Sequence, residues 1–206
     1  MTVFGRGLEA LTFPQRMYSR VEVLARPSPV PNVSGIYGWY FSNVPDQIDA
    51  SRCIKVQGRK LLYVGIAPRS PSGSKASLRS RLRTHYRGNA EGSTLRLTLG
   101  CLLGFQLRRV GGGTVMTFGP AELELSNWMA TNAFVTWIED PRPWLQESII
   151  IRSLDLPLNL DQNANHGFHA RLSELRRDAR RRALQLPIVG RRSDPKFRLR
   201  ANPSPR

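Results

Sequence analysis

Gly35-Ile36-Tyr37 and Tyr63-Val64-Gly65 are the two triplets that decide the fold, and each lies in a stretch typical of a β-strand. Both stretches are rich in aromatic and branched side chains, which favour a pleated surface. The segment between them contains residues that break regular structure: Asn43, Pro45, Asp46 and Gly58. We therefore expect two strands, joined by a long loop, that pair antiparallel and set Tyr37 and Tyr63 side by side.

A helix is expected after the second strand. Ser77 is a suitable N-cap and Gly88 a suitable end. The apolar positions between them recur at helical spacing: Leu78, Leu82 and Tyr86. Arg81 and His85 lie one turn apart beside this apolar face, so both side chains are expected to reach toward the strands.

The rest of the chain alternates short helices and strands. Its patterns predict a helix over 94–103, a hairpin over 105–119 that turns at Gly111–Gly113, a helix from Pro120 to Met129 and a buried strand from Ala133 to Glu139. Asp140 and Pro141 are expected to begin the helix that carries Glu147. The fold class is α/β, with a small, mostly antiparallel sheet flanked by helices.

Glu147 is an acidic residue in an apolar helical sequence, so its helix is expected to pack inside the protein. Its helical neighbours are Pro143, Trp144, Ile150 and Ile151, none of which can neutralise a carboxylate. A buried, unpaired carboxylate is costly, which implies either a distant arginine or a metal ion as its partner.

In this order, Tyr37, Tyr63, Arg81, Glu147 and Asn159 resemble the motif of the GIY-YIG nuclease superfamily over roughly residues 34 to 163. The long segment between the tyrosines, and Ile66 where many members have a basic residue, resemble the branch that contains some type II restriction enzymes. The spacings of Arg81 and His85, and of Glu147 and Asn159, also occur in that branch. The resemblance implies an endonuclease of the restriction or phage-defence type that holds one divalent ion beside a scissile phosphate.

The resemblance also implies roles for these residues. Tyr37 is expected to act as the base or to position the attacking water, with His85 orienting it or sharing its proton, because imidazole has the suitable intrinsic pKa. Tyr63 would hold a metal-bound water or the phosphate, Arg81 would balance phosphate charge, and Glu147 would bind the metal. Mg²⁺, or Mn²⁺ in its place, suits a site with one carboxylate.

Asn159 has two readings. Its place in the motif implies that it orients the active-site strands or the phosphate, whereas asparagine after a helix often serves only a turn. Arg79 and Arg83 flank the motif arginine and are expected to point outward, as contacts to a nucleic-acid backbone or as solvated side chains.

The net charge of +16 and a pI near 11.3 favour a polyanionic partner. We expect DNA, although nothing in the composition excludes RNA. A nucleic-acid-binding protein without catalysis and a basic RNA-associated protein are the alternatives. The two cysteines, Cys53 and Cys101, are too few for a disulfide framework or a cysteine-based zinc site, and no stretch resembles a signal peptide or membrane span. We therefore expect a cytoplasmic protein that does not act at a membrane.

The basic charge is concentrated at the C-terminus. Residues 164–206 hold twelve basic and three acidic residues, which predicts a basic helix followed by a disordered tail from Arg191 to Arg206. The apolar stripe of the helix would dock on the protein, and its arginines would grip a phosphate backbone: Arg171, Arg176, Arg177, Arg180 and Arg181. A helix for a protein partner or a homodimer is the alternative. Residues 1–33 form a lead-in, residues 34–163 the nuclease-like domain and residues 164–206 this basic extension.

Overall fold

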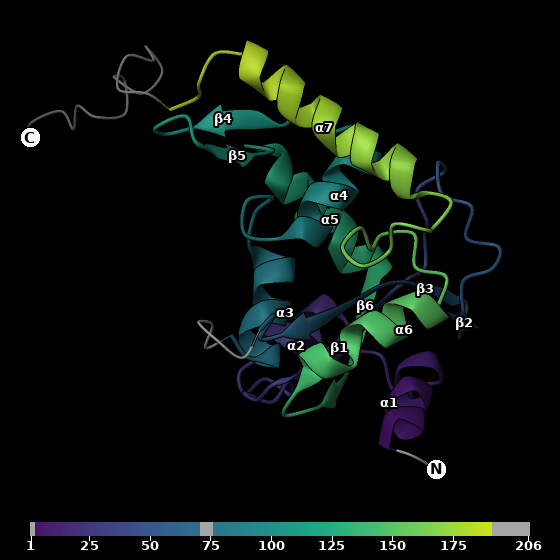
Figure 1. Cartoon of the computed structure of the whole chain (residues 1–206). Helices are drawn as coiled ribbons and strands as arrows, with labels where there is room; N and C mark the ends of the chain where they lie inside the picture. The colour runs from purple at the N-terminus through teal and green to yellow at the C-terminus, as the bar shows by residue number, and fades with distance from the viewer. Residues whose placement is uncertain (1–2, 71–75, 191–206) are drawn as a thin grey trace, which may run out of the picture.

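The computed structural model of the chain describes residues 3–70 and 76–190. The segment expected to be disordered, Arg191 to Arg206, lies outside the described residues. The described part has a sheet between two layers of helices, and α7 (His169–Gln185) lies at the end remote from the N-terminus (Figure 1). None of its helices is both long enough and apolar enough to cross a membrane.

The main sheet has four strands in the order β2-β3-β1-β6, and every neighbouring pair is antiparallel. The strands are β1 (Gly35–Phe41), β2 (Lys55–Val56), β3 (Arg59–Ala67) and β6 (Ala133–Glu139). All residues of β1 are buried because helices cover both faces of this central strand. The expected α/β class and antiparallel sheet are confirmed.

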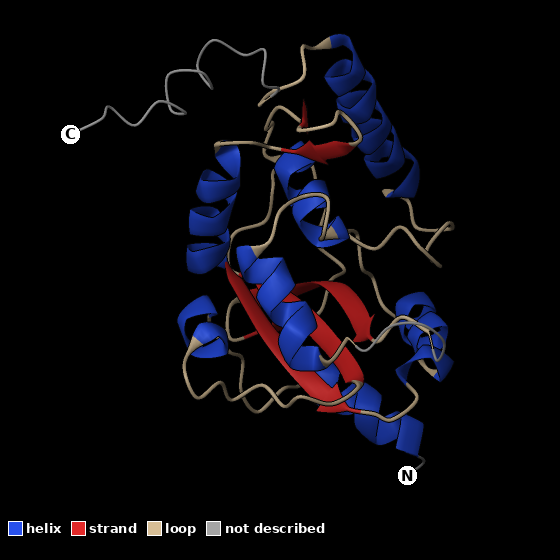
Figure 2. Cartoon of the chain, turned by 90° about the vertical axis from the view of Figure 1, so that its left-hand side faces the viewer, coloured by secondary structure: helices blue, strands red, loops and turns tan. Residues whose placement is uncertain are grey.

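Helices cover the two faces of the sheet with separate cores. Tyr37, Trp39 and Tyr63 belong to the core under α3 (Leu78–Arg87), which crosses in front of the sheet in Figure 2. On the other face, Ile36 and Tyr40 pack with α1 (Val3–Thr12) and α6 (Glu147–Ser153). Both tyrosines of the motif therefore lie on the α3 face.

The register of β1 and β3 places the two tyrosines diagonally. Trp39 is opposite Tyr63 and Tyr37 is opposite Gly65, so the Tyr37 and Tyr63 rings are neighbours on one face with centroids 6.5 Å apart. The expected proximity of the tyrosines is confirmed.

The remaining helices largely match the sequence patterns. Ser77 caps α3 by accepting from the Ser80 amide at 3.2 Å, and Gly88 ends that helix. The other elements are α2 (Arg20–Leu24), α4 (Thr94–Leu102), β4 (Arg108–Val110), β5 (Val115–Thr117) and α5 (Ala121–Asn132). The helix α5 runs three residues beyond the expected end at Met129, directly into β6.

The start of α6 differs from the expectation. Residues Pro143–Leu145 form a separate 3₁₀ turn, and α6 begins at Glu147 itself. Asp140 does not cap α6, because its carboxylate accepts from the Arg142 amide at 2.7 Å and from Gln146 Nε2 at 2.6 Å. Leu145 and Ile149 are 56% and 51% exposed. The expectation that this helix is buried on nearly every side is therefore wrong, and Glu147 lies at its half-exposed N-terminal end.

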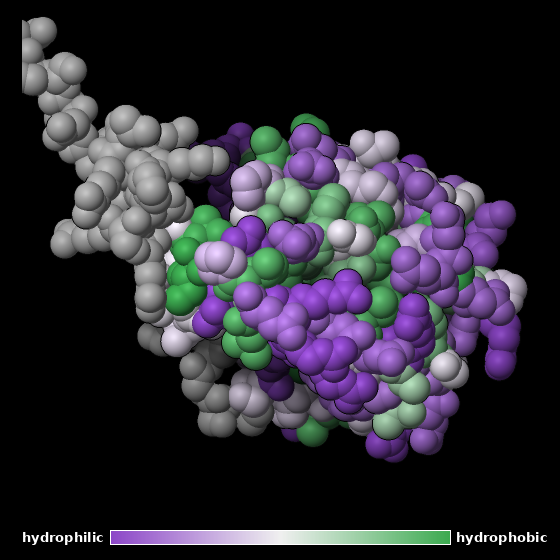
Figure 3. All heavy atoms as spheres, turned by 90° about the horizontal axis from the view of Figure 1, so that it is seen from above, coloured by the Kyte–Doolittle hydropathy of each residue, from purple (hydrophilic) through white to green (hydrophobic). Residues whose placement is uncertain are grey.

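The helix α7 docks by its apolar stripe, as expected. Leu172 and Ala183 are buried, while Phe168, Leu175 and Ala179 pack against the same core. The outward arginines are exposed: Arg171, Arg177, Arg180, Arg181 and Arg182. Figure 3 looks down on this side of the molecule and shows a broad band of hydrophilic side chains.

The fold requires glycine at position 65. A Cβ atom there would lie 2.6 Å from the Tyr37 hydroxyl oxygen and 2.9 Å from a ring carbon of Tyr63. We predict that Gly65→Ala lowers the free energy of unfolding by about 1–3 kcal/mol, because a rigid sheet cannot absorb this overlap. Gly112→Ala is the control, since its Cβ would meet nothing within 4 Å. Equal urea midpoints for the two variants would contradict this packing role.

Candidate active site

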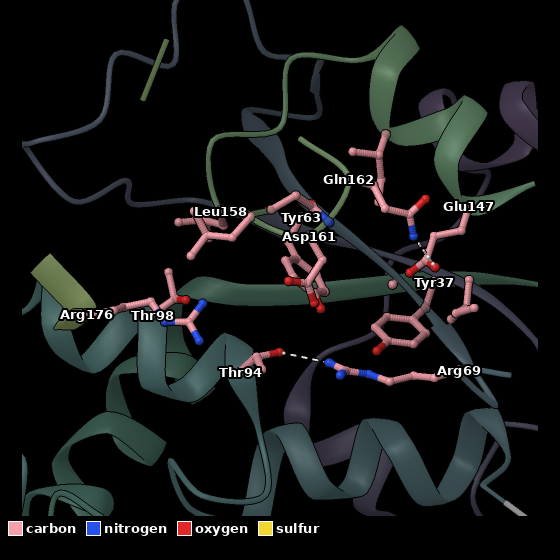
Figure 4. Close-up of a pocket in the computed structure, with 15 residues that line it drawn as sticks. Tyr37, Tyr63, Arg69, Thr94, Thr98, Glu147, Leu158, Asp161, Gln162 and Arg176 are labelled. Carbon is pink, nitrogen blue, oxygen red and sulfur yellow. Dashed lines mark hydrogen bonds between the residues drawn. The ribbon is translucent and has the colours of Figure 1, made fainter. Parts of the chain in front are cut away.

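A pocket of about 210 Å³ lies beside β3 on the open side of the sheet (Figure 4). Tyr37, Tyr63, Glu147 and Asn159 all line it. These residues come from β1, β3, α6 and the loop after α6, so segments far apart in the sequence meet in the pocket. Of the sequence-predicted residues, Arg81 and His85 do not line the pocket but lie behind Tyr37.

Asn159 binds the backbone between the second tyrosine and its glycine. Its Oδ1 accepts from the Val64 amide at 2.9 Å, and its Nδ2 donates to the Val64 carbonyl at 2.8 Å. The β2 strand pairs only with the first residues of β3, so the Asn159 amide satisfies backbone groups that no strand covers. This contact fixes the part of β3 that carries Tyr63.

The hydroxyl of Tyr37 is part of a buried hydrogen-bond chain. It lies 2.9 Å from His85 Nε2, and His85 Nδ1 lies 2.7 Å from Ser93 Oγ. Ser93 Oγ also accepts from the Arg96 amide at 3.1 Å as the N-cap of α4. The sequence predicted the partnership of Tyr37 and His85, but Ser93 carries no signal beyond that of an ordinary helix cap.

Two tautomers of His85 fit these hydrogen bonds. Among the described residues, the hydroxyl protons of Ser93 and Tyr37 each have a ring nitrogen of His85 as their only acceptor. In one tautomer Ser93 donates to Nδ1 and Nε2–H donates to the Tyr37 oxygen; in the other, Tyr37 donates to Nε2 and Nδ1–H donates to Ser93. Burial, together with Arg81, Arg69 and Arg96, lowers the pKa of His85 well below 6.5. His85 is therefore neutral at neutral pH.

Arg81 donates a second hydrogen bond to the same oxygen. Its Nε lies 3.4 Å from the Tyr37 hydroxyl, and its Nη1 donates to the Gly92 carbonyl at 3.2 Å. Burial and Tyr63 raise the pKa of Tyr37 above its ordinary value, and the charge of Arg81 opposes this effect. Arg81, together with the Nε2–H tautomer of His85, would donate two hydrogen bonds to a Tyr37 phenolate, although burial disfavours its negative charge.

A buried ion pair supports the helices behind His85. Arg96 is 0% exposed and bonds to Glu122 Oε2 at 2.6 Å, and its Nη1 also donates to the His85 carbonyl at 3.3 Å. Glu122 Oε1 accepts from the amides of Ala90 and Phe118. This pair ties α3, α4 and α5 together. Nothing local in the sequence distinguishes Arg96 from the exposed arginines.

Glu147 lies in the pocket without an ion pair to any described residue. Gln162 Nε2 donates to its Oε2 at 2.8 Å. Burial raises the pKa of the Glu147 carboxyl above its ordinary value, while Gln162 and the charge of Arg69 oppose the shift. The sequence expected a distant arginine or a metal ion as the partner; the only hydrogen-bond partner found among the described residues is the neutral Gln162.

The residues around Glu147 fit a divalent cation that keeps most of its water. The described residues contain no cluster of three or more His, Cys, Asp or Glu side chains that could enclose a metal. A half-buried carboxylate without an ion pair to any described residue nevertheless suits an ion held mainly by water and substrate oxygens. Asp161 lines the same pocket and supplies a second carboxylate nearby.

Two residues of the pocket, Arg69 and Gln162, belong to none of the motifs found in the sequence. Arg69 follows β3, and its Nη2 lies 3.4 Å from the Thr94 hydroxyl at the start of α4. Arg69 supplies a positive charge close to Ile66, the position at which many family members have a basic residue. Gln162 likewise lies three residues after Asn159 with no pattern that marks it.

The arginines predicted to contact nucleic acid differ in their exposure and in their hydrogen bonds. Arg79 Nε donates to the Val30 carbonyl at 2.7 Å, so it joins α3 to the lead-in, whereas Arg83 is half-exposed. Four of the five arginines named for α7 are exposed, and Arg176 instead lines the pocket.

The lowered pKa of His85 has a consequence for stability. The unfolded chain binds a proton at this histidine as the pH falls below about 6.5, but the folded protein does not. The contribution of His85 to the free energy of unfolding should therefore be complete near pH 7 and be lost progressively as the pH falls toward 5. We predict that His85→Gln makes this decline shallower, whereas the half-exposed His169→Gln retains it. Urea unfolding at each pH measures both slopes; equal slopes for the two variants would contradict the buried, neutral state.

Comparison with known proteins agrees with this geometry. Searches of curated proteins and of solved structures found no match. The family model described as the GIY-YIG catalytic domain matches residues 35–178. That range includes the tyrosine pair, His85, Glu147, Asn159 and every residue that lines the pocket. The chain belongs to the GIY-YIG family, whose members are endonucleases and typically use divalent metal ions.

Proposed function

We propose that the protein is a metal-dependent endonuclease that hydrolyses phosphodiester bonds in DNA. One observation carries the proposal: Tyr37, held by His85 and Arg81, faces the same pocket as Tyr63 and the unneutralised Glu147. A protein that only binds nucleic acid has no need of this buried arrangement. The net charge of +16 supports a polynucleotide substrate.

In this proposal, Tyr37 positions the attacking water, and its phenolate form takes the water's proton and becomes the neutral phenol. The N–H groups of His85 and Arg81 hold the Tyr37 oxygen and stabilise the phenolate that precedes this transfer. The neutral His85 is thus a positioning residue that orients Tyr37, in preference to sharing its proton. Tyr63 lies beside Tyr37 and directs its ring to the pocket, where its hydroxyl can hold the phosphate.

Glu147, with Asp161 near it, would hold the metal ion, and we propose Mg²⁺ or Mn²⁺. A divalent ion there would stabilise charge on the phosphoryl and leaving oxygens. Arg69 lines the same pocket and Arg81 approaches it through Tyr37, so both guanidinium groups can balance phosphate charge. Asn159 would keep Tyr63 in register through its two bonds to Val64.

The exposed arginines of α7 would grip the nucleic-acid backbone without reading its sequence. A role in restriction or defence against phage is the finer part of this proposal, supported by the spacings of Arg81 and His85 and of Glu147 and Asn159. A reduced, cytoplasmic setting is also part of the proposal, because it suits the free thiols Cys53 and Cys101.

We predict that Glu147→Gln abolishes Mg²⁺-dependent nicking of plasmid DNA and leaves binding to a DNA duplex nearly unchanged. The amide has the shape of the carboxylate but removes the charge that holds the ion. Glu124→Gln, at an exposed position of α5, is the matched control and should nick as the wild-type protein does. Nicking by Glu147→Gln at the wild-type rate would refute the metal assignment.

A further inference from the structure

We propose that Arg176, on the inner side of α7, holds the phosphate next to the one that is cut. The nucleic-acid strand would then lie along the first two turns of α4. This inference rests on the proposed nuclease function and deepens it, because it assigns the pocket a second phosphate position and a direction for the strand.

Arg176 differs from the other arginines of its helix in where its side chain points. It lines the pocket together with Tyr63 and Thr98, whereas Arg177, the next residue, is exposed. In Figure 4 the Arg176 side chain leaves α7 and enters the pocket from the side opposite Arg69. The basic helix thus supplies one guanidinium to the pocket itself.

The Arg176 guanidinium has unsatisfied hydrogen-bonding capacity. Its Nε is buried, and among the described residues it has neither a hydrogen-bond partner nor a carboxylate that forms an ion pair with it. Burial and the nearby Arg180 lower the pKa of Arg176 from its ordinary value. A buried charged donor without a partner is costly. An anion that enters the pocket would remove this cost, and a phosphate oxygen matches the planar guanidinium.

The two arginines of the pocket act at different ends of it. The charge of Arg69 is felt by Tyr37, His85 and Glu147, and Arg69 therefore belongs to the reacting end. Arg176 instead interacts with Tyr63 and Asp161.

Thr94 and Thr98 lie one turn apart on α4 and line the pocket between these ends. Their hydroxyl groups can donate to oxygens along the same path. A single phosphate can occupy only one end, so this arrangement suits consecutive phosphates of a strand.

Kinetics on a modified DNA duplex test the assignment. The preferred cut in a short duplex is mapped from its product ends, and the duplex is then remade with a neutral methylphosphonate at each phosphate beside the cut. For the wild-type protein, one of these changes should lower kcat/KM by about tenfold or more, because a hydrogen bond to a charged group is lost.

The variant Arg176→Gln should show a similar loss on unmodified DNA, mainly through a higher KM, and no further loss at that one methylphosphonate position. Arg182→Gln is the matched control, since it removes the same charge from an exposed position of α7. It should keep the full penalty of the methylphosphonate. Affinities measured in the Glu147→Gln background, where no cutting intervenes, should follow the same pattern.

Several outcomes would overturn the inference. The first is that Arg176→Gln retains the full methylphosphonate penalty at every position. The second is that Arg176 serves only to neutralise Asp161. In the second case, Asp161→Asn would restore the DNA affinity of Arg176→Gln, measured in the Glu147→Gln background. If Arg176→Gln does not fold, Arg176→Lys, which keeps the charge but loses the planar fork, undergoes the same measurements and must lose the positional penalty. Wild-type protein that neither binds nor cuts DNA would overturn the proposed function as well as this inference.

Discussion

The contact of Tyr37 with Gly65 across β1 and β3 is the constraint on which the site depends. The register places these two residues opposite each other, and the missing side chain at Gly65 leaves room for the phenol ring. The hydroxyl of Tyr37 then reaches His85 and Arg81 on α3. Any residue larger than glycine would displace the ring from these donors. The glycine of the second triplet is thus a requirement of tyrosine packing, and the two triplets form one unit.

The charges of the site are held by different means. Arg96 and Glu122 form a buried pair that anchors the helices behind His85. Glu147, Arg69 and Arg176 line the pocket and form no ion pair within the described part of the chain. Because folding leaves these pocket charges without ion-pair partners, a bound substrate and cation can supply the opposite charges. A structural ion pair such as Arg96 with Glu122 is neutralised by folding itself, whereas a binding site is neutralised by its ligand. A pocket prepared in this way favours a ligand that carries both a metal and phosphates.

Much of this structure could be predicted from local sequence. Aromatic and branched side chains indicated β1, β3 and β6, and Ser77 followed by apolar residues at helical spacing indicated α3. The start of α6 could not be predicted, because Asp140 and Pro141 form a plausible cap but Asp140 bonds to Gln146 instead. The sequence also did not predict that Arg69, Gln162 and Arg176 line the pocket. Their places depend on how loops and α7 pack in three dimensions, and in so basic a chain no pattern separates an inward arginine from a solvated one.

The central claim is that the oxygen of Tyr37, held by His85 and Arg81, takes part in cleavage. Single-turnover cleavage of a DNA duplex by Tyr37→Phe tests it most directly, because this change removes one oxygen atom and keeps the ring that packs on Gly65. We expect the rate to fall by about 10²-fold or more, while DNA binding remains close to that of the wild-type protein and the variant, although less stable, is fully folded without urea. Cleavage by Tyr37→Phe at the wild-type rate would contradict it.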